Sequence, residues 1–212
     1  MTPFKAAAIL AMLLAGAGSA RAGTIVTIID PTNFGGFETA GETAAQWAPT
    51  AGFPTATLTI TTTGSHYFPG NATHYASIQT GGVAAGWQFV GLQNLSVTPG
   101  DVVTFSAEVW GGLANDKIGL NYGPAGSVTL STPPADAQTL AGGGYQLETF
   151  TFTPTTSTID IDIGFLQTNS GASWMDVVSV TQDIPGSIPE PASMALLGAA
   201  LFGLGLVRRK FG

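Results

Sequence analysis

Alternating apolar and polar residues mark several short segments of the chain. The clearest segment is 101–110, DVVTFSAEVW, in which every second residue from Val103 to Val109 is apolar. Because side chains on a strand point alternately to opposite faces, this spacing predicts a strand with one buried face. The same alternation predicts further strands over 55–63, 145–153, 158–165 and 173–181.

Turn residues separate these segments, and no long segment has the 3.6-residue apolar period of an amphipathic helix. Short strands that recur with such turns are typical of two packed antiparallel sheets. The pattern therefore predicts an all-β domain, an antiparallel β-sandwich. The clearest turn signals are Pro99-Gly100-Asp101, Gly123-Pro124, Pro133-Pro134 and Gly142-Gly143-Gly144.

The beginning of the chain departs from this pattern. Lys5 is followed by an uninterrupted run of small and apolar residues, and Ala20-Arg21-Ala22 fits the small-x-small rule of signal peptidase. Residues 1–22 are therefore expected to be a signal peptide, and a buried N-terminal helix is the alternative. The folded domain is expected over 23–183, with 184–188 as a short linker.

The end of the chain, 189–212, is expected to be a sorting and anchor segment. Residues 192–207 are uncharged and span about 24 Å as a helix, against roughly 30 Å for the hydrocarbon core of a membrane. We expect a short transmembrane helix, extended because the basic side chains after it snorkel to the membrane surface. The positive-inside rule leaves these basic residues in the cytoplasm and the domain outside. They are Arg208, Arg209 and Lys210.

Pro189, Glu190 and Pro191 stand just before this apolar run, where the prolines keep the backbone extended and accessible. Together with the apolar run and the basic cluster, they resemble the PEP-CTERM sorting signal of Gram-negative bacteria. The resemblance implies export through the inner membrane, transient anchoring there, and cleavage near the motif by an exosortase. It also implies association with extracellular polysaccharide at the cell surface or in the matrix. An ordinary single-span anchor is the alternative.

The charge of the domain is strongly negative. Between residues 23 and 183, twelve carboxylates accompany a single basic residue, Lys117, so the formal charge is −11. Nucleic acid is excluded as a partner because binding it requires a basic surface. Carboxylates outside the cell are suited to calcium. The chain has no cysteine, which excludes disulfides, a thiol nucleophile and a zinc–thiolate site.

Three segments resemble, in order, the galactose-binding-like jelly rolls found among carbohydrate-binding modules. They are 33–39 (NFGGFET), 87–110 and 174–180 (WMDVVSV), and the first corresponds to an N-terminal "GFE" strand. The resemblance implies a fold that binds carbohydrate. It also implies one structural calcium between the first and last strands, with Glu38 and Asp176 as ligands. In the alternative, Glu38 is solvated and Asp176 caps a turn.

Strand parity puts Trp110, Glu108 and Ser106 together on the polar face of 101–110. An exposed indole beside a carboxylate and a hydroxyl has the makeup of a carbohydrate site, in which the ring stacks on a sugar. In the alternative, Trp110 lies beneath a loop or over a sheet edge, since most tryptophans are largely buried. Weaker candidates for stacking are Trp47, Tyr122 and Trp87.

Asp160 and Asp162 share one face of their strand, about 7 Å apart, a separation found in inverting glycosidases. We interpret them as a solvated face, because catalytic carboxylates need unlike environments around a scissile bond. His66 and His74 lack a convincing third metal ligand and are interpreted as loop residues.

Our main hypothesis is therefore an exported, non-enzymatic surface or matrix protein that associates with exopolysaccharide and biofilm. Two alternatives stay open. One is a secreted polysaccharide-active enzyme that uses Asp160 and Asp162 or another carboxylate pair. The other is a structural matrix protein that binds no sugar.

Overall fold

The computed structural model of the chain describes residues 23–32, 34–39, 42–48, 57–61, 74–79, 86–167 and 172–186. Within these ranges, ten strands form two antiparallel sheets, and two short 3-10 helices lie between the first two strands. The predicted all-β sandwich is confirmed. The expected signal peptide and the anchor segment lie outside the described residues. In the described ranges, no helix is long and apolar enough to cross a membrane.

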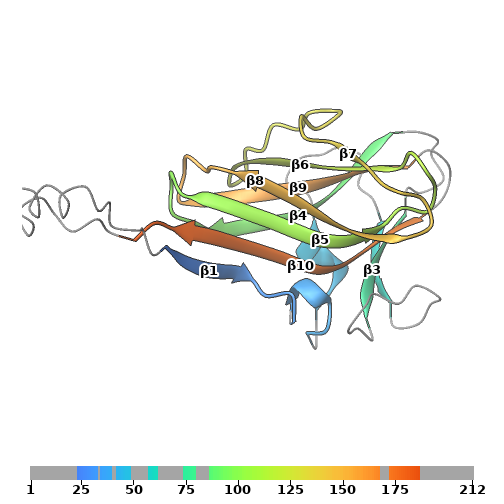
Figure 1. Cartoon of the computed structure of the whole chain (residues 1–212), viewed down its shortest axis with the longest axis horizontal. Coiled ribbons are helices and arrows are strands. Elements are labelled where there is room, and N and C mark those ends of the chain that lie inside the picture. The colour runs from blue at the N-terminus through green and yellow to red at the C-terminus, as the bar shows by residue number, and fades with distance from the viewer. Residues whose placement is uncertain are drawn as a thin grey trace, which may run out of the picture. The chain divides into compact units, whose positions relative to one another are not determined.

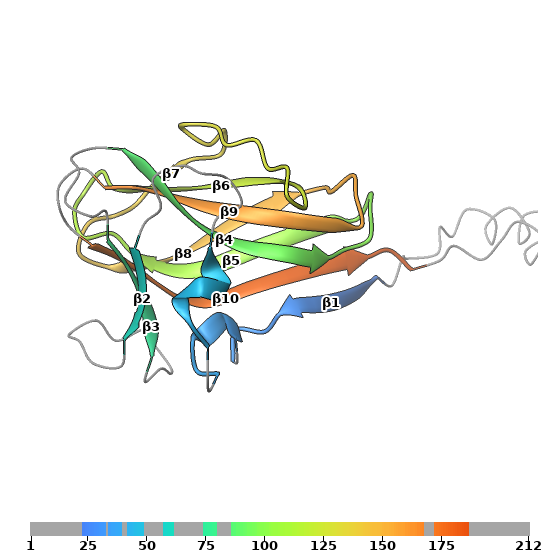
Figure 2. The ribbon, with the colours of Figure 1, turned by 180° about the vertical axis from the view of Figure 1, so that it is seen from behind.

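The larger sheet is built around the last strand, β10 (Ala172–Ile184), which pairs with strands from both ends of the domain. β3 (Tyr75–Gln79) pairs with the first four residues of β10, and β5 (Val102–Trp110) pairs along most of its length. Figure 2 shows β3 and its neighbour running steeply across the other strands. The sheet is completed by β2 (Thr57–Thr61) beside β3, β8 (Tyr145–Phe152) beside β5, and β1 (Thr24–Ile29) beside β10.

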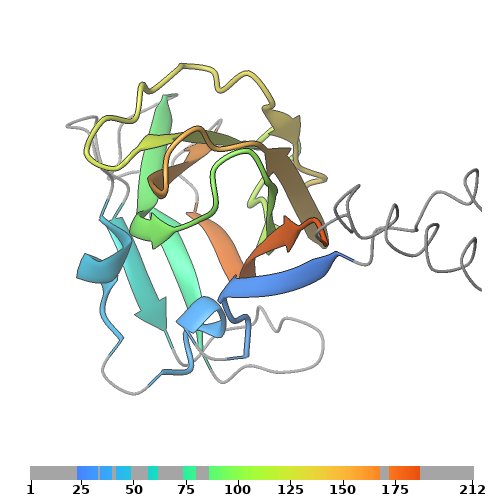
Figure 3. The same cartoon turned by 90° about the vertical axis from the view of Figure 1, so that its left-hand side faces the viewer.

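The smaller sheet forms the second layer of the sandwich (Figure 1). Its order is β4 (Trp87–Ser96), β9 (Thr158–Leu166), β6 (Lys117–Pro124) and β7 (Gln138–Thr139). Residues 125–137 connect β6 to β7 and arch over the outside of this sheet (Figure 3). We call them the covering segment.

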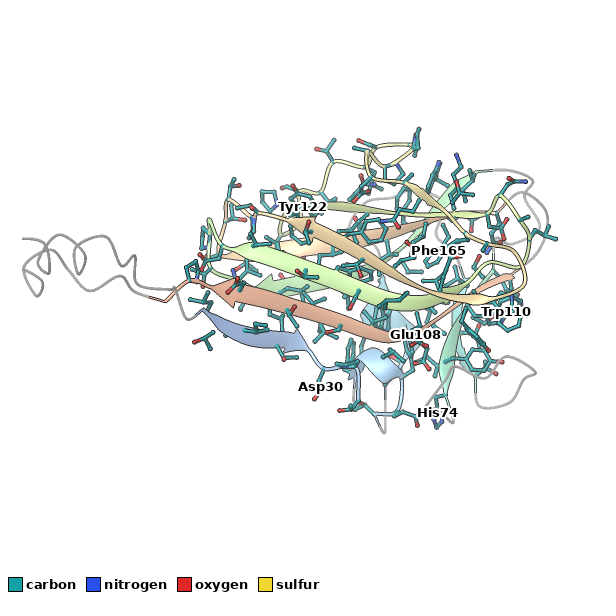
Figure 4. All side chains as sticks on the ribbon, viewed as in Figure 1. Asp30, His74, Glu108, Trp110, Tyr122 and Phe165 are labelled. Carbon is teal, nitrogen blue, oxygen red and sulfur yellow. The ribbon has the colours of Figure 1, made fainter. Side chains whose placement is uncertain are left out.

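The core lies between the two sheets, and strand parity explains which residues enter it. On β5, the four alternate residues from Val103 to Val109 are each 0% exposed, while Trp110 is half-buried on the other face. This confirms the parity predicted from the sequence. Figure 4 shows Phe165 of β9 between the two layers. The core that these β5 side chains join also includes Phe150, Phe152, Ile159, Ile161, Ile163, Met175, Val178 and Val180.

The segment expected to be the "GFE" strand is instead the 3-10 helix η1 (Phe34–Gly36), and the expectation was wrong. Gly35 donates its N–H to the carbonyl of Asp30, at 2.9 Å, and packs directly on β10. A Cβ at Gly35 would lie 1.7 Å from the carbonyl oxygen of Val178, so only glycine fits. The chain forms a tight turn at this close approach. The first strand along the chain is β1, which precedes the turn.

Trp47 ends the second 3-10 helix, η2 (Ala44–Trp47), and is only 1% exposed. Its ring stacks on Phe34 with 5.3 Å between ring centroids, and its indole N–H donates to the carboxylate of Glu42 at 2.9 Å. Trp47 is therefore part of the core and presents no ring face to a ligand.

Candidate functional site

Three aromatic rings lie in one row on the outer surface of the larger sheet. Trp110 of β5 is the direct cross-strand partner of both Tyr145 on β8 and Trp174 on β10. The centroid of the Trp110 ring lies 4.6 Å from that of Tyr145 and 6.1 Å from that of Trp174. All three side chains are half-buried. We call these residues the aromatic row.

Two carboxylates form the next row of the same surface. Glu108 and Asp176 are direct cross-strand partners on β5 and β10, one pleat from the aromatic row. Figure 4 shows Glu108 near Trp110. Asp176 is 0% exposed, and its Oδ1 accepts the N–H of Val177 at 2.7 Å. We call Glu108 and Asp176 the acidic pair.

The acidic pair holds two buried oxygens that bind nothing in the described part of the chain: Oδ2 of Asp176 and Oε2 of Glu108. Buried polar atoms almost always have a hydrogen-bond partner, so such exceptions require an explanation. Two such exceptions lie here on adjacent strands, beside the aromatic row.

The surroundings of the acidic pair favour its neutral form. Burial raises the pKa of Asp176 to about 7; the Val177 hydrogen bond opposes this shift, and the charges of Glu38 and Glu108 add to it. Burial also raises the pKa of Glu108. The pKa of Tyr145 is raised to about 12 by burial and by nearby Tyr75, Asp176 and Glu108, so its phenol stays protonated as an O–H donor.

Glu38 follows η1 and binds His74, the residue before β3. Its Oε1 accepts the backbone N–H of His74 at 2.8 Å, and its Oε2 lies 2.8 Å from His74 Nδ1. The alternative of a merely solvated Glu38 is therefore wrong. His74 has a structural contact that sequence reasoning missed, because no sequence pattern joins residues 36 positions apart. His66 lies outside the described residues.

Calcium at Glu38 and Asp176 stays a prediction. The charge of Glu38 contributes to the raised pKa of Asp176, and Oδ2 of Asp176 has no hydrogen-bond partner in the described structure and could bind an ion. In the described ranges, however, no three side chains of Asp, Glu, His or Cys are grouped so as to hold a metal ion. Calcium takes six to eight oxygens, so backbone carbonyls or water would have to supply most of the shell.

Ser106 begins a third row, beside Ser179 on β10 and Thr149 on β8. Together with Trp110 and Glu108 it lies on the outer face, each residue about 7 Å from the next along β5. Sequence parity thus placed these three side chains on one face. It missed Tyr145 and Trp174 as their neighbours, because the register between strands that are distant in sequence is not written in either strand alone.

The interpretation of Asp160 and Asp162 as a solvated face was wrong. They are only 2% and 0% exposed. Oδ1 of Asp160 accepts the N–H of Asn94 and Oδ2 accepts that of Gly126, each at 2.7 Å. Asn94 and Gly126 have φ values of 58° and 74°, so Asp160 holds the bulge of β4 and the turn after β6 in left-handed conformations.

The covering segment explains this burial. The side chain of Asn121 on β6 exchanges two hydrogen bonds with the backbone of Ser131, both at 3.3 Å. The carboxylate of Asp136 accepts the N–H of Leu120 at 3.0 Å. An alternating strand pattern cannot reveal that a loop from elsewhere closes its polar face.

The two remaining weaker candidates lie apart from the aromatic row. Tyr122 is 43% exposed and stacks on Phe152 with 4.0 Å between ring centroids. Figure 4 shows it well away from Trp110. Trp87 is half-buried at the start of β4 in the smaller sheet.

Comparison with known proteins identifies the end of the chain. Residues 187–210 match the PEP-CTERM protein-sorting motif, a span that holds both the Pro189–Pro191 segment and the basic cluster. The sorting signal expected from the sequence is confirmed. The motif implies export and membrane anchoring before exosortase cleavage. No curated protein sequence matches the chain.

Solved structures share the fold of the domain. The CBM22-1 xylan-binding domain from Paenibacillus barcinonensis aligns with a TM-score of 0.53 at 14% identity, covering 80% of this chain and 100% of that one. The tandem CBM22-1–CBM22-2 domain of the same protein aligns with a TM-score of 0.53 at 15% identity, covering 82% of this chain and 49% of that one.

An enzyme also shares this fold. The Stig cyclase Fisc from Fischerella sp. TAU, in complex with (3Z)-3-(1-methyl-2-pyrrolidinylidene)-3H-indole, aligns with a TM-score of 0.51 at 16% identity, covering 77% of this chain and 100% of that one. At such low identity these likenesses concern the fold and leave the activity open. The chain thus joins a PEP-CTERM sorting motif to a β-sandwich with the fold of carbohydrate-binding modules.

Proposed function

We propose that the outer face of the larger sheet is a carbohydrate-binding surface of an exported, non-enzymatic protein. The observation that carries this proposal is the aromatic row beside the acidic pair. Aromatic faces suit the C–H faces of sugar rings, and the unpartnered carboxylate oxygens in the described structure suit their hydroxyl groups. The row crosses three neighbouring strands, about 10 Å, and so favours an extended ligand.

We expect each contact to be weak. Stacking of nucleic-acid bases on aromatic side chains is worth about 1–3 kcal/mol, and a sugar gains no more. A Kd on the order of 0.1–1 mM for a short oligosaccharide corresponds to about −4 to −5.5 kcal/mol. A repeating polymer compensates through avidity when several copies bind along it.

The proposal also concerns location. In it, residues 1–22 direct export through the inner membrane of a Gram-negative bacterium, and the C-terminal helix anchors the protein until an exosortase cleaves it. The domain then associates with exopolysaccharide at the cell surface or in the matrix of a biofilm. Intact mass spectrometry of the protein from a host with exosortase should show loss of the tail near Pro189–Pro191. A mature protein that still ends at Gly212 would contradict this part of the proposal.

Trp110→Ala tests the binding surface. Loss of the central ring of the aromatic row should weaken retention on exopolysaccharide of the host at least about tenfold, equivalent to about 1.4 kcal/mol. The melting temperature should change by only a few degrees, because Trp110 lies on the outer face. Affinity electrophoresis measures retention, and circular dichroism measures melting.

Trp87→Ala is the matched control, since it removes the same ring from the other sheet. It should leave retention unchanged; equal loss in both variants would show that the assigned face is wrong. If the wild-type protein is not retained by any host polysaccharide, the alternative of a structural matrix protein takes the place of this proposal. If the wild-type protein shortens the polysaccharide, the alternative of a polysaccharide-active enzyme takes the place of this proposal.

A further inference from the structure

The rings of the aromatic row meet at steep angles instead of lying flat. The plane of Trp110 is turned 85° from that of Tyr145 and 71° from that of Trp174. Parallel rings would form a platform for one flat sugar face. Rings packed edge to face present inclined faces beside the acidic pair, and we call this place the corner. Aromatic faces with nearby carboxylates are the groups that bind ammonium in aromatic cages.

The corner is bordered by the acidic pair, and the described residues place no cation beside it that would stabilise its ionised form. Glu108 and Asp176 lie in the adjacent row, each with a buried oxygen that has no partner in the described structure. The only lysine of the described residues, Lys117, is on β6 in the other sheet. His74 is held by Glu38. Among the described residues nothing positive therefore balances the acidic pair when it is ionised, and an ammonium ligand would stabilise that form.

We infer that this corner binds the ammonium group of an amino sugar, so that the ligand is a polysaccharide with free amino groups. The inference rests on the proposed carbohydrate-binding function and names its ligand class. An ammonium group donates three hydrogen bonds, and bonds of charged donors to carboxylates are roughly twice as strong as neutral ones. Aromatic faces add cation–π attraction that a neutral sugar does not receive.

The same charges select against other polymers. Uronic acid polymers carry carboxylates, which the acidic pair and the domain's formal charge of −11 repel. Neutral polymers can donate hydroxyl hydrogens to the unpartnered oxygens but leave the charge unbalanced. The expected order of affinity is therefore amino sugar, then neutral sugar, then uronate.

Hexamers with one β-1,4-linked backbone test this order. Hexamers of glucosamine, N-acetylglucosamine and glucose share size and linkage and differ in the group at carbon 2. Calorimetry is done with the purified protein at about pH 7, near the pKa of Asp176, so that its carboxylate is present beside protonated amines. A chelator excludes a competing metal ion. We expect the glucosamine hexamer to bind at least about tenfold more tightly than either neutral hexamer, and a hexauronate to bind most weakly.

Three isosteric variants locate the preference. Glu108→Gln and Asp176→Asn should each reduce the ratio of amine to neutral affinity to less than about three. Asp183→Asn is the matched control: it removes the same charge from the same face of β10, about 20 Å away along the strand. It should leave the ratio unchanged. Raising the salt concentration tenfold should weaken binding of the glucosamine hexamer alone.

Each other outcome overturns the inference. Equal affinity for neutral and amine hexamers would refute the amine preference and leave the proposed carbohydrate function standing. An equal effect of Asp183→Asn would show that the hexamer responds to overall charge and not to the corner. If none of the hexamers binds, while Trp110→Ala still abolishes retention on host polysaccharide, the ligand class is wrong and the face is right. If retention also fails, both proposals fall.

Discussion

The two outer surfaces of the sandwich treat a buried aspartate in opposite ways. On the smaller sheet, Asp160 has each oxygen bound by a backbone N–H, and the covering segment lies over that sheet. On the larger sheet, Asp176 is buried as deeply, but only one of its oxygens has a partner within the described structure. The residue type and the depth are the same, and the supply of donors differs.

This difference separates Asp160, a structural carboxylate, from Asp176, a candidate binding carboxylate. A carboxylate with saturated hydrogen bonds contributes to stability, because its loss would leave buried N–H groups without acceptors. A buried carboxylate with an unpartnered oxygen lowers the stability of the free protein. The protein regains this stability when a ligand donates a hydrogen bond to that oxygen. Burial alone does not distinguish Asp160 from Asp176; the number of donors does.

The largest effect is expected for Asp160→Asn. The amide keeps one carbonyl oxygen and turns an NH2 group toward the other N–H, so one of two charge-assisted bonds is lost and the other is weakened. We expect the free energy of unfolding to fall by about 3–4 kcal/mol. Urea unfolding measures the change.

The control for this substitution is Asp183→Asn on an exposed position, which should stay within about 0.5 kcal/mol of the wild type. If Asp160→Asn is equally mild, the hydrogen bonds from Asn94 and Gly126 do not hold the turns as described.

The same substitution at Asp176 should act in the opposite direction. Its pKa in the folded protein, about 7, exceeds the ordinary value of 3.8, so the folded chain takes up a proton that the unfolded chain lacks between these values. The stability of the wild type therefore falls as the pH rises from about 4 to about 7, and it stays at the lower value at higher pH. Asp176→Asn removes this cost and should raise the free energy of unfolding by about 2–3 kcal/mol at pH 8.

The gain should be smaller at pH 5 than at pH 8, since part of the cost is already relieved where the folded carboxyl is protonated. Unfolding curves at both pH values, with chelator present, make the comparison. A variant less stable than the wild type at pH 8 would show that the second oxygen of Asp176 has a partner after all, and the contrast with Asp160 would disappear.

Calcium is expected to have the smallest effect. If Glu38 and Asp176 hold an ion with a Kd of about 0.1 mM, then about 1 mM calcium stabilises the fold by about 1.4 kcal/mol. The melting temperature would rise by about 4 °C, and Asp176→Asn would abolish the rise. Identical melting of metal-free and calcium-loaded wild type would contradict the predicted site.

Local patterns predicted the strands well because their information is local. The parity of β5 follows from residues two apart, and it placed Trp110, Glu108 and Ser106 on one face. The alternation in 145–153 and 158–165 likewise gave β8 and β9. Where the backbone turned for a distant reason, the prediction failed. Gly35 bends against Val178, more than 140 positions away, and the expected "GFE" strand became a turn.

The candidate site was predicted in part for the same reason. The row from Tyr145 to Trp174 exists only through the pairing of three strands, and no single segment contains it. The burial of Asp160 depends on distant backbone donors and on a loop that closes the surface above it. The charge imbalance, by contrast, is a property of composition and needs no knowledge of the fold, and the exclusion of nucleic acid that follows from it stays a prediction.

The covering segment also fixes how many polymers one copy can hold. With the outer face of the smaller sheet covered, the proposed surface on the larger sheet has a valency of one. Through that surface alone, a single copy can coat a polysaccharide strand but cannot cross-link two strands. Any network that this protein helps to build would therefore need a second attachment point, such as the membrane anchor before cleavage or a neighbouring copy on another strand.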